Sequence, residues 1–429
     1  MTTQDDNASP VARARALAKA GRNGEAAEVV ARLLNEEFGL QAVNCAINSD
    51  IYSLNSLNGT FEAGGKPLFF KFHQEENEGA MAGEYYRARL LADAGLPVDL
   101  PLHVSSEPGR QILVYRRRAD PRFADVLRKL DLADDADGRK IALAAELGLN
   151  ARTMEVYRQT LHAITTAQSA AEPIHRLFHE RLVTPGRPGA LGGRFTSYYQ
   201  HQAFALPGLT IGWDELKTLA FAVNGVRYDR TLGQLFDAAF VRLRPDQLAD
   251  NGGVTAHGDA HNANVWFAGG QLALFDPAFA GSHIPALLAE VKTTFHNVFA
   301  HPLWLYEPAE ATKCYSAATR RRGDTLHIEH DWRPGPVRLG LMQLKAEQIW
   351  KPLLALLAAQ GLLPADWRRV VKLALFLCPT LVMNLRAGAD GGSHNPVSSA
   401  IGLATAVEMG AEPERMDVLS QMLDAVTPG

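Results

Sequence analysis

The sequence predicts an α+β protein with a small antiparallel β-sheet, one long helix beside that sheet, and a large, mostly helical remainder. Short β-prone runs separated by turn residues fill residues 41–118. Beyond residue 118, most apolar residues recur at helical spacing. The expected organisation is a helical extension over residues 1–39, a sheet domain over 40–118 and a helical domain over 119–429.

Composition excludes several classes of protein. The net charge of −4 gives no electrostatic reason to expect a nucleic-acid partner. The three cysteines are scattered and form no CxxC pair, so neither a disulfide framework nor a zinc site is indicated. No apolar run is long enough to span a bilayer, and the N-terminus lacks the apolar core of a signal peptide. These features favour a cytoplasmic protein that binds neither nucleic acid nor membrane.

Two helices are expected at the N-terminus, between Val11 and Phe38, with a break at Gly21–Gly24 and a stop at Gly39. We interpret them as a helical cap on the following domain. The alternative is an arm for dimerisation, so the chain is expected to be a monomer or a homodimer.

Four strands are expected, over Gln41–Ile47, Ile51–Phe61, Pro67–Phe72 and Gln111–Tyr115. The third carries one charge, Lys71, among aromatic side chains. A lysine in such a strand must either extend its ammonium to solvent or meet an anion. An exposed lysine on an edge strand is the alternative without function.

A long helix is expected from about Asn77 to Ala94, ended by Gly95. Helical geometry places Glu84 on the flank of the apolar stripe of this helix, which makes it the best carboxylate partner for Lys71. A solvated glutamate paired with Arg87 is the alternative.

The densest polar motif is His257-Gly258-Asp259-Ala260-His261-Asn262-Ala263-Asn264. Two apolar runs joined by a Gly-Gly turn follow it and predict a β-hairpin, after which comes Asp276. The hairpin should bring Asp276 back towards Asp259 and Asn264. Phosphoryl transfer needs such a set: one carboxylate to orient a hydroxyl, and an Asn with a second Asp to hold Mg²⁺.

This HGDxHxxN loop, with the hairpin and the later Asp, resembles the aminoglycoside phosphotransferase and choline kinase-like family. The resemblance implies a protein-kinase-like, two-lobed fold and an ATP-dependent phosphotransferase that acts on a hydroxyl of a small molecule, such as a sugar, an amino alcohol or an antibiotic. It assigns the residues the following roles: Asp259 orients the acceptor, Asn264 and Asp276 hold Mg²⁺, Lys71 binds the α- and β-phosphates, and Glu84 fixes Lys71. We expect His257 to brace the loop, and His261 either to touch substrate or to brace the turn.

Two further cofactor contacts follow from position alone. The resemblance places a phosphate-covering loop at Asn48–Ser53, including Ser49, although this loop lacks the glycines of protein kinases. It places the hinge that holds the adenine edge at Val114, Tyr115 and Arg116. ATP is the expected nucleotide, with GTP as the alternative.

The helical part is expected to carry much of the acceptor pocket, and the stretch Arg194–Tyr199 either reaches the site or starts a helix with buried tyrosines. Glu290 and Lys292 are interpreted as a structural salt bridge within a helix over Ile284–Phe299. The predicted helices of this part include Arg139–Leu147, Thr153–Ala170, Trp213–Ala222, Thr231–Val241, Ala309–Arg321, Gly340–Gln360, Pro364–Met383 and Pro396–Met409.

Two other functions are compatible with parts of the sequence. One is a catalytically silent nucleotide-binding module that acts through a partner, against which the complete set of expected catalytic groups argues. The other is a protein kinase, which the missing glycine-rich loop and activation segment disfavour. The acceptor itself is not identified. A polycationic antibiotic would require clustered acids, and the acids between Asp125 and Asp137 read as a solvated loop.

Overall fold

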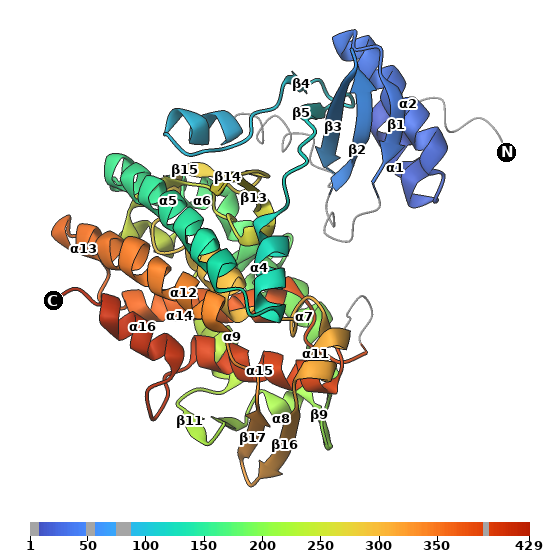
Figure 1. The fold of residues 1–429 in the computed structure, drawn as a ribbon. Helices are drawn as coiled ribbons and strands as arrows, with labels where there is room; N and C mark the ends of the chain where they lie inside the picture. Colours follow the sequence, from blue (N-terminus) through green and yellow to red (C-terminus); the bar gives the residue numbers. More distant parts are fainter. Residues whose placement is uncertain (1–7, 49–55, 74–86, 389–393) are drawn as a thin grey trace. The chain divides into compact units, whose positions relative to one another are not determined.

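A computed structural model describes residues 8–48, 56–73, 87–388 and 394–429 (Figure 1). The chain divides into two compact units. The smaller comprises residues 1–93, 97–120 and 275–278, and the larger comprises 94–96, 121–274 and 279–429. The smaller unit holds an antiparallel sheet and the larger unit is mostly helical, as the predicted α+β class requires.

The sheet of the smaller unit has five antiparallel strands in the order β1-β2-β3-β5-β4. Lys71 lies on the middle strand, opposite Asn58 on one side and Leu113 on the other. It is therefore not an edge lysine. The strands are β1 Val43–Ile47, β2 Ser56–Ala63, β3 Lys66–His73, β4 His103–Ser105 and β5 Ile112–Arg116.

The two N-terminal helices, α1 (Pro10–Lys19) and α2 (Asn23–Phe38), belong to this unit. Ser9 caps α1, and Gly39 ends α2 in the left-handed conformation that glycine adopts most easily. Their apolar residues form one core with the sheet, including Val30, Leu34, Phe61, Phe70 and Val114. The helices thus cover the sheet, in the manner of a cap.

Two of the sequence predictions fall on residues that the structure does not describe. Ser49 lies within 49–55, and Glu84 lies within 74–86. Of the helix predicted over Asn77–Ala94, residues 87–93 are described and are helical. The proposed Lys71–Glu84 pair therefore stays a prediction.

Helices form most of the larger unit (Figure 1). The hydrophobic helix α14 packs along α15, and α5 packs against α12 and α13. The helices are α4 Phe123–Leu132, α5 Ala136–Thr160, α6 Thr166–Ala171, α7 Gly193–Tyr198, α8 Trp213–Leu216, α9 Leu232–Arg242, α10 Val291–Thr294, α11 Pro308–Cys314, α12 Pro336–Lys345, α13 Lys351–Ala359, α14 Trp367–Val382, α15 Pro396–Gly410 and α16 Val418–Val426. Shorter 3₁₀ turns are η1 Pro173–Leu177, η2 His179–Leu182, η3 Gln247–Asn251 and η4 Asn262–Asn264, and π-helical turns are η5 Phe295–Phe299 and η6 Ala346–Trp350.

Strands of the larger unit form one four-stranded sheet, in the order β11-β10-β17-β16, and several two-stranded ones. They are β6 Val183–Thr184, β7 Arg187–Leu191, β8 Ala203–Leu206, β9 Leu209–Gly212, β10 Ala220–Val223, β11 Val226–Tyr228, β12 Gly253–Ala256, β13 Val265–Ala268, β14 Gln271–Leu274, β15 Gly281–Pro285, β16 Ala317–Arg322 and β17 Thr325–His330.

The four-stranded sheet contradicts two predicted helices. The helix expected over Trp213–Ala222 ends at Leu216 and gives way to β10, and the helix expected over Ala309–Arg321 ends at Cys314 and gives way to β16. The reason is non-local: β10 pairs in parallel with β17, which buries Phe221 and Leu326. Local periodicity carries no information about a partner so far away in the sequence.

Two other predictions need correction. Residues 139–147 and the first part of 153–170 form one helix, α5, which continues through Gly148. The helix expected over Ile284–Phe299 begins only at Val291, because Gly281–Pro285 pairs with β12 as β15. Among the residues that the structure describes, no helix is both long enough and apolar enough to cross a membrane.

Candidate active site

The HGDxHxxN motif forms a tight loop after the buried strand β12, which pairs with β15. Gly258 has a φ of +77°, and a Cβ there would lie 2.5 Å from the carbonyl oxygen of Phe279. Glycine alone satisfies both conditions. The glycine between His257 and Asp259 is thus required by the path of the loop, and it allows the two flanking side chains to be buried.

Hydrogen bonds within the loop fix its polar side chains. The Asp259 amide donates to His257 Nδ1 at 3.3 Å, and Asn264 Nδ2 donates to the Asp259 carbonyl at 2.9 Å. The Asn264 amide in turn donates to the carbonyl of His261 at 2.7 Å. His257 therefore braces the loop, which is the geometry expected for it. Asn264 is held to the loop by its side-chain nitrogen and its backbone amide.

The carboxylate of Asp259 lies among cationic and polar groups. Lys292 Nζ is 3.8 Å from Oδ1, and His261 Nε2 is 3.9 Å from Oδ2. Asp259 is only 9% exposed, and its Oδ1 accepts no hydrogen bond from the residues that the structure describes. A buried carboxylate oxygen without a donor is the feature that a substrate hydroxyl would complete.

Lys292 was not recognised as a site residue from the sequence. It was predicted to pair with Glu290, but its ammonium instead donates to His296 Nε2 at 2.8 Å and faces Asp259. Burial lowers the pKa of Lys292, while the charge of Asp259 opposes that change. Burial also lowers the pKa of His296 well below its usual range, so this imidazole is neutral and accepts from the ammonium. The other ring nitrogen of His296 bonds to the Tyr306 hydroxyl.

The π-helical turn η5 holds the loop from a second side. Asn297 Oδ1 accepts from the Asn262 amide at 2.9 Å, and the Asn297 carbonyl accepts from Arg338 Nη1 at 2.9 Å. Arg338 is buried and paired with Asp131 at 2.6 Å. The prediction that Asp131 belongs to a group of solvated acidic residues is wrong. Its carboxylate is buried because it pairs with Arg338 of α12.

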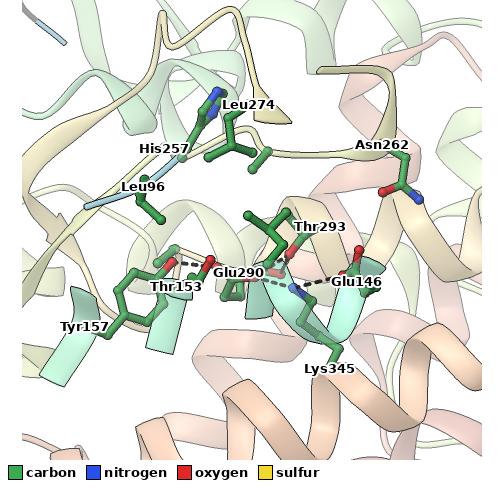
Figure 2. A pocket seen from close by; sticks show the side chains of 14 residues that line it. Leu96, Glu146, Thr153, Tyr157, His257, Asn262, Leu274, Glu290, Thr293 and Lys345 are labelled. Carbon is green, nitrogen blue, oxygen red and sulfur yellow. Dashed lines mark hydrogen bonds and ion pairs between the residues drawn. The ribbon is translucent and has the colours of Figure 1, made fainter. Parts of the chain in front are cut away.

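A pocket borders the loop at residues that flank Asp259, namely His257, Gly258, Ala260 and Asn262. Its floor is a buried polar network (Figure 2). Lys345 Nζ lies 3.0 Å from Glu290 Oε2, and the Tyr157 hydroxyl donates to Glu290 Oε1 at 2.5 Å. Glu146 lies 3.5 Å from Lys345, and burial raises the pKa of its carboxyl. The charged groups of this network bind one another, so we infer that the network supports the loop and does not bind a ligand.

The β-hairpin predicted after the loop is present as β13 and β14, joined at Gly269-Gly270. Asp276 follows it with a φ of +57° and belongs, with residues 275–278, to the smaller unit. Lys71 Nζ of that unit donates to Asp276 Oδ1 at 2.6 Å. Lys71 thus meets a carboxylate, and the carboxylate is the one predicted to hold metal.

The two predicted metal ligands have suitable chemistry. Asn264 offers an amide oxygen, and Asp276 offers a carboxylate whose side chain is 37% exposed. Oxygen donors of this kind suit Mg²⁺. Among the described residues, no group of three or more His, Cys, Asp or Glu is arranged to hold a metal ion.

The predicted hinge residues Val114, Tyr115 and Arg116 form the end of β5, where they pair with β3. On the other side of β5, pairing with β4 ends at His103, opposite Val114, and the Leu102 amide donates to the Val114 carbonyl at 2.7 Å. Their contact with an adenine ring stays a prediction.

No protein-family model and no curated protein matches the chain. Several solved structures are similar to it. One is a thermostable mutant of the aminoglycoside phosphotransferase APH(4)-Ia in a ternary complex with ADP and hygromycin B, with 14% identity, 89% of this chain and 99% of that chain covered, and a TM-score of 0.45. A spectinomycin phosphotransferase, APH(9)-Ia, in complex with ADP and spectinomycin has 11% identity, covers 89% and 98%, and has a TM-score of 0.39. A choline kinase from Cryptosporidium parvum has 7% identity, covers 89% and 94%, and has a TM-score of 0.39.

The similar structures are thus aminoglycoside phosphotransferases and a choline kinase, the two groups that the loop motif resembles. At these identities and TM-scores the similarity assigns no role to any residue, and the function is argued from the site itself.

Proposed function

We propose that the chain is an ATP-dependent phosphotransferase that transfers the γ-phosphoryl group to a hydroxyl of a small molecule. The observation that carries the proposal is Asp259, a buried carboxylate on a rigid loop with one oxygen that accepts no hydrogen bond from the described residues. Catalysis of this class depends mainly on positioning and on neutralising charge.

In the proposed reaction, Asp259 accepts the hydrogen bond, and then the proton, of the acceptor hydroxyl. The acceptor oxygen forms a bond to the γ-phosphorus while the bond from that phosphorus to the β,γ-bridging oxygen breaks. ADP leaves with the electron pair of that bond. Lys292, close to Asp259, would offset the negative charge that gathers beside it.

The nucleotide would be held by the smaller unit. Lys71 is fixed on the middle of the sheet and would bind the α- and β-phosphates, with ATP preferred and GTP as an alternative. Mg²⁺, held by Asn264 and Asp276, would neutralise phosphate charge. The Lys71–Asp276 pair keeps both charged groups ordered when nucleotide is absent.

The alternative is a nucleotide-binding protein without catalysis. It would be favoured by the loss of a charged or metal-binding group, but Lys71, Asp259, Asn264 and Asp276 are all present.

The test is the Asp259→Asn variant, assayed for ADP formation with a panel of hydroxylated metabolites. Turnover should fall by about 10²–10⁴-fold while nucleotide binding, measured by thermal shift, persists. Asp237→Asn, an exposed residue of α9, is the matched control and should retain activity. Full turnover by Asp259→Asn would refute the assignment, and nucleotide binding without phosphorylation of any compound would favour the alternative.

A further inference from the structure

We propose that the acceptor carries an anionic group, a carboxylate or a phosphate, which binds to Arg181 and Arg194 beside Asp259. This inference rests on the proposed kinase function and names the chemical class of its acceptor. It follows from the side chains that surround Asp259 within the larger unit.

Two short segments bring the arginines together. Arg181 lies on the turn η2, and Arg194 lies on α7, which packs against η2. Gly193, at the start of α7, has a φ of +55°, and a Cβ there would lie 2.5 Å from the carbonyl oxygen of Val183 and 2.9 Å from that of Arg181. Only glycine allows α7 to begin so close to η2.

Both arginines and Asp259 act electrostatically on Lys292, and Arg194 and Asp259 also act on Arg181. The pKa of Arg181 is lowered to about 10, chiefly by burial and also by the charge of Arg194, while the charge of Asp259 opposes the change. Lys292 responds to the same groups: burial lowers its pKa, Asp259 raises it, and Arg181 and Arg194 lower it. Lys292 lies on α10, which packs against α14, and Arg194 bonds to carbonyl oxygens at the end of α14. We refer to Arg181, Arg194 and Lys292 as the cationic cluster.

The two guanidinium groups differ in how they are satisfied. Arg194 Nη1 donates to the carbonyl oxygens of Leu381 at 2.9 Å and Val382 at 3.3 Å, at the end of α14, which anchors it. Arg181 Nη1 is buried, yet it has no hydrogen-bond partner among the residues that the structure describes. An unmade hydrogen bond of a buried group costs about 1–3 kcal/mol, and more for a charged one, so Arg181 presents a donor suited to an anionic acceptor oxygen.

The charges of the cluster do not cancel. Asp259 is the one carboxylate among the described groups that act on Lys292, whereas two further cations, Arg181 and Arg194, act on it. The other acidic neighbour is Cys378, and burial raises the pKa of its thiol to about 11, so it stays neutral. Buried cations in excess are costly unless an anion accompanies them. A bound carboxylate or phosphate would supply that charge.

The cluster suits the acceptor better than the nucleotide. Lys71, the group proposed for the nucleotide phosphates, belongs to the smaller unit, whereas Arg181 and Arg194 belong to the helical unit that carries the proposed base. A cationic acceptor placed against Asp259 would be repelled by the Lys292 ammonium, 3.8 Å from Oδ1, and by the charge of Arg181, which interacts with Asp259. An acceptor with a hydroxyl near an anionic group would instead be attracted and oriented, with its hydroxyl at Asp259.

Binding provides the first test, with the full chain and three matched sets of probes. The sets are glycerate, glycerol 3-phosphate and glycerol; gluconate, glucose 6-phosphate and glucose; and serine, phosphoserine and choline. Affinity is measured by calorimetry in the presence of a non-hydrolysable ATP analogue. At least one carboxylate or phosphate should bind more than about 10-fold tighter than its neutral or cationic counterpart. The carboxylate and phosphate members of each set distinguish the two sources of negative charge.

The Arg181→Gln variant should lose that preference, whereas Arg181→Lys, which keeps the charge, should retain part of it. Arg320→Gln, on the exposed strand β16, removes one positive charge elsewhere and should change nothing. Arg181→Gln removes a buried unpaired donor, so its melting temperature should not fall, and circular dichroism checks that it folds. Equal binding of anionic and neutral probes, or unchanged anion binding in Arg181→Gln, would overturn the proposal.

Turnover with ATP separates this inference from the proposed function. We expect phosphorylation of an anionic acceptor, with Arg181→Gln raising KM for that acceptor by at least about 10-fold and leaving the affinity for nucleotide unchanged. Preferred phosphorylation of choline or a neutral sugar would refute the anionic acceptor and keep the kinase. Arg181-dependent binding of anions without phosphorylation of any compound would refute the kinase and keep the anion site.

Discussion

Lys71 Nζ and Asp276 Oδ1 lie 2.6 Å apart and join residues that are 205 positions apart in the sequence. Lys71 is nearly buried in the middle of the sheet, whereas the Asp276 side chain is 37% exposed. Partly exposed ion pairs contribute at most about 1 kcal/mol to stability. The pair therefore matters more for placing the lysine beside the carboxylate that is proposed to hold Mg²⁺ than for the free energy of unfolding.

Replacement of Lys71 by Met tests that view. The variant should lose phosphate contacts, so turnover should fall by about 10²-fold or more, while the free energy of unfolding changes by no more than about 1 kcal/mol. ADP formation and urea unfolding measure the two effects. Lys66→Met, an exposed residue at the start of β3, is the control. Unchanged turnover in Lys71→Met would remove Lys71 from the site.

Lys292→Met tests the cation next to Asp259. Turnover should fall by about 10²-fold, because the nearby cation that would offset the negative charge gathering beside Asp259 is lost. The pKa of Lys292 is lowered by burial, so its ammonium deprotonates at a lower pH than an ordinary lysine. The wild type should therefore lose activity as pH rises through that lowered pKa, and Lys292→Met should lack this alkaline decline. An identical alkaline limb in both proteins would assign the titration to another group.

The buried ion pair Asp131–Arg338 supports the loop through Asn297. Asp131→Ala leaves the Arg338 guanidinium buried without its anion, so unfolding should become easier by about 3–5 kcal/mol. Asp134→Ala, whose side chain is 96% exposed, should change stability by less than about 1 kcal/mol. Chemical denaturation of both variants gives the comparison. Equal stabilities would mean that Asp131 is not needed to satisfy Arg338.

The close approach of α7 to η2 can be tested with Gly193→Ala. A Cβ at this position would contact two carbonyl oxygens, and the residue has a left-handed conformation, so the variant should be destabilised by about 1–3 kcal/mol. Gly189→Ala is a suitable control, because nothing lies within 4 Å of its added Cβ. Both are measured by thermal unfolding. If Gly193→Ala matched the control, α7 would not be held against η2 as described.

The sequence could predict the parts of the site that are local in the chain. The loop from His257 to Asn264, the hairpin after it and the strand with Lys71 all carry their signals within a few residues. The bracing role of His257 was predictable for the same reason, since its partner is the amide two residues later.

The parts that could not be predicted depend on distant contacts. From the sequence, Lys292 was interpreted as the salt-bridge partner of Glu290. In the structure Glu290 binds Lys345 from α12, and Lys292 lies close to Asp259. Asp131 reads as solvated until Arg338 reaches it. The second half of the helix predicted over Ala309–Arg321 is instead part of β16, because β17 provides a partner strand. In each case the partner that determines the outcome lies on another helix or strand, and the local sequence pattern does not identify it.

The parallel pairing of β10 with β17 also has a consequence for folding. It joins Ala220 to Thr325, and the whole stretch from the loop with Asp259 to Lys292 lies in the chain between them. Bringing together the ends of so long a segment costs conformational entropy before the strands can form hydrogen bonds. Non-local pairing of this kind therefore slows folding. The sheet and the segment that carries the site should therefore form together and late in folding. The proposed phosphotransferase activity should then return during refolding at the same time as the β17 amides become protected from hydrogen exchange.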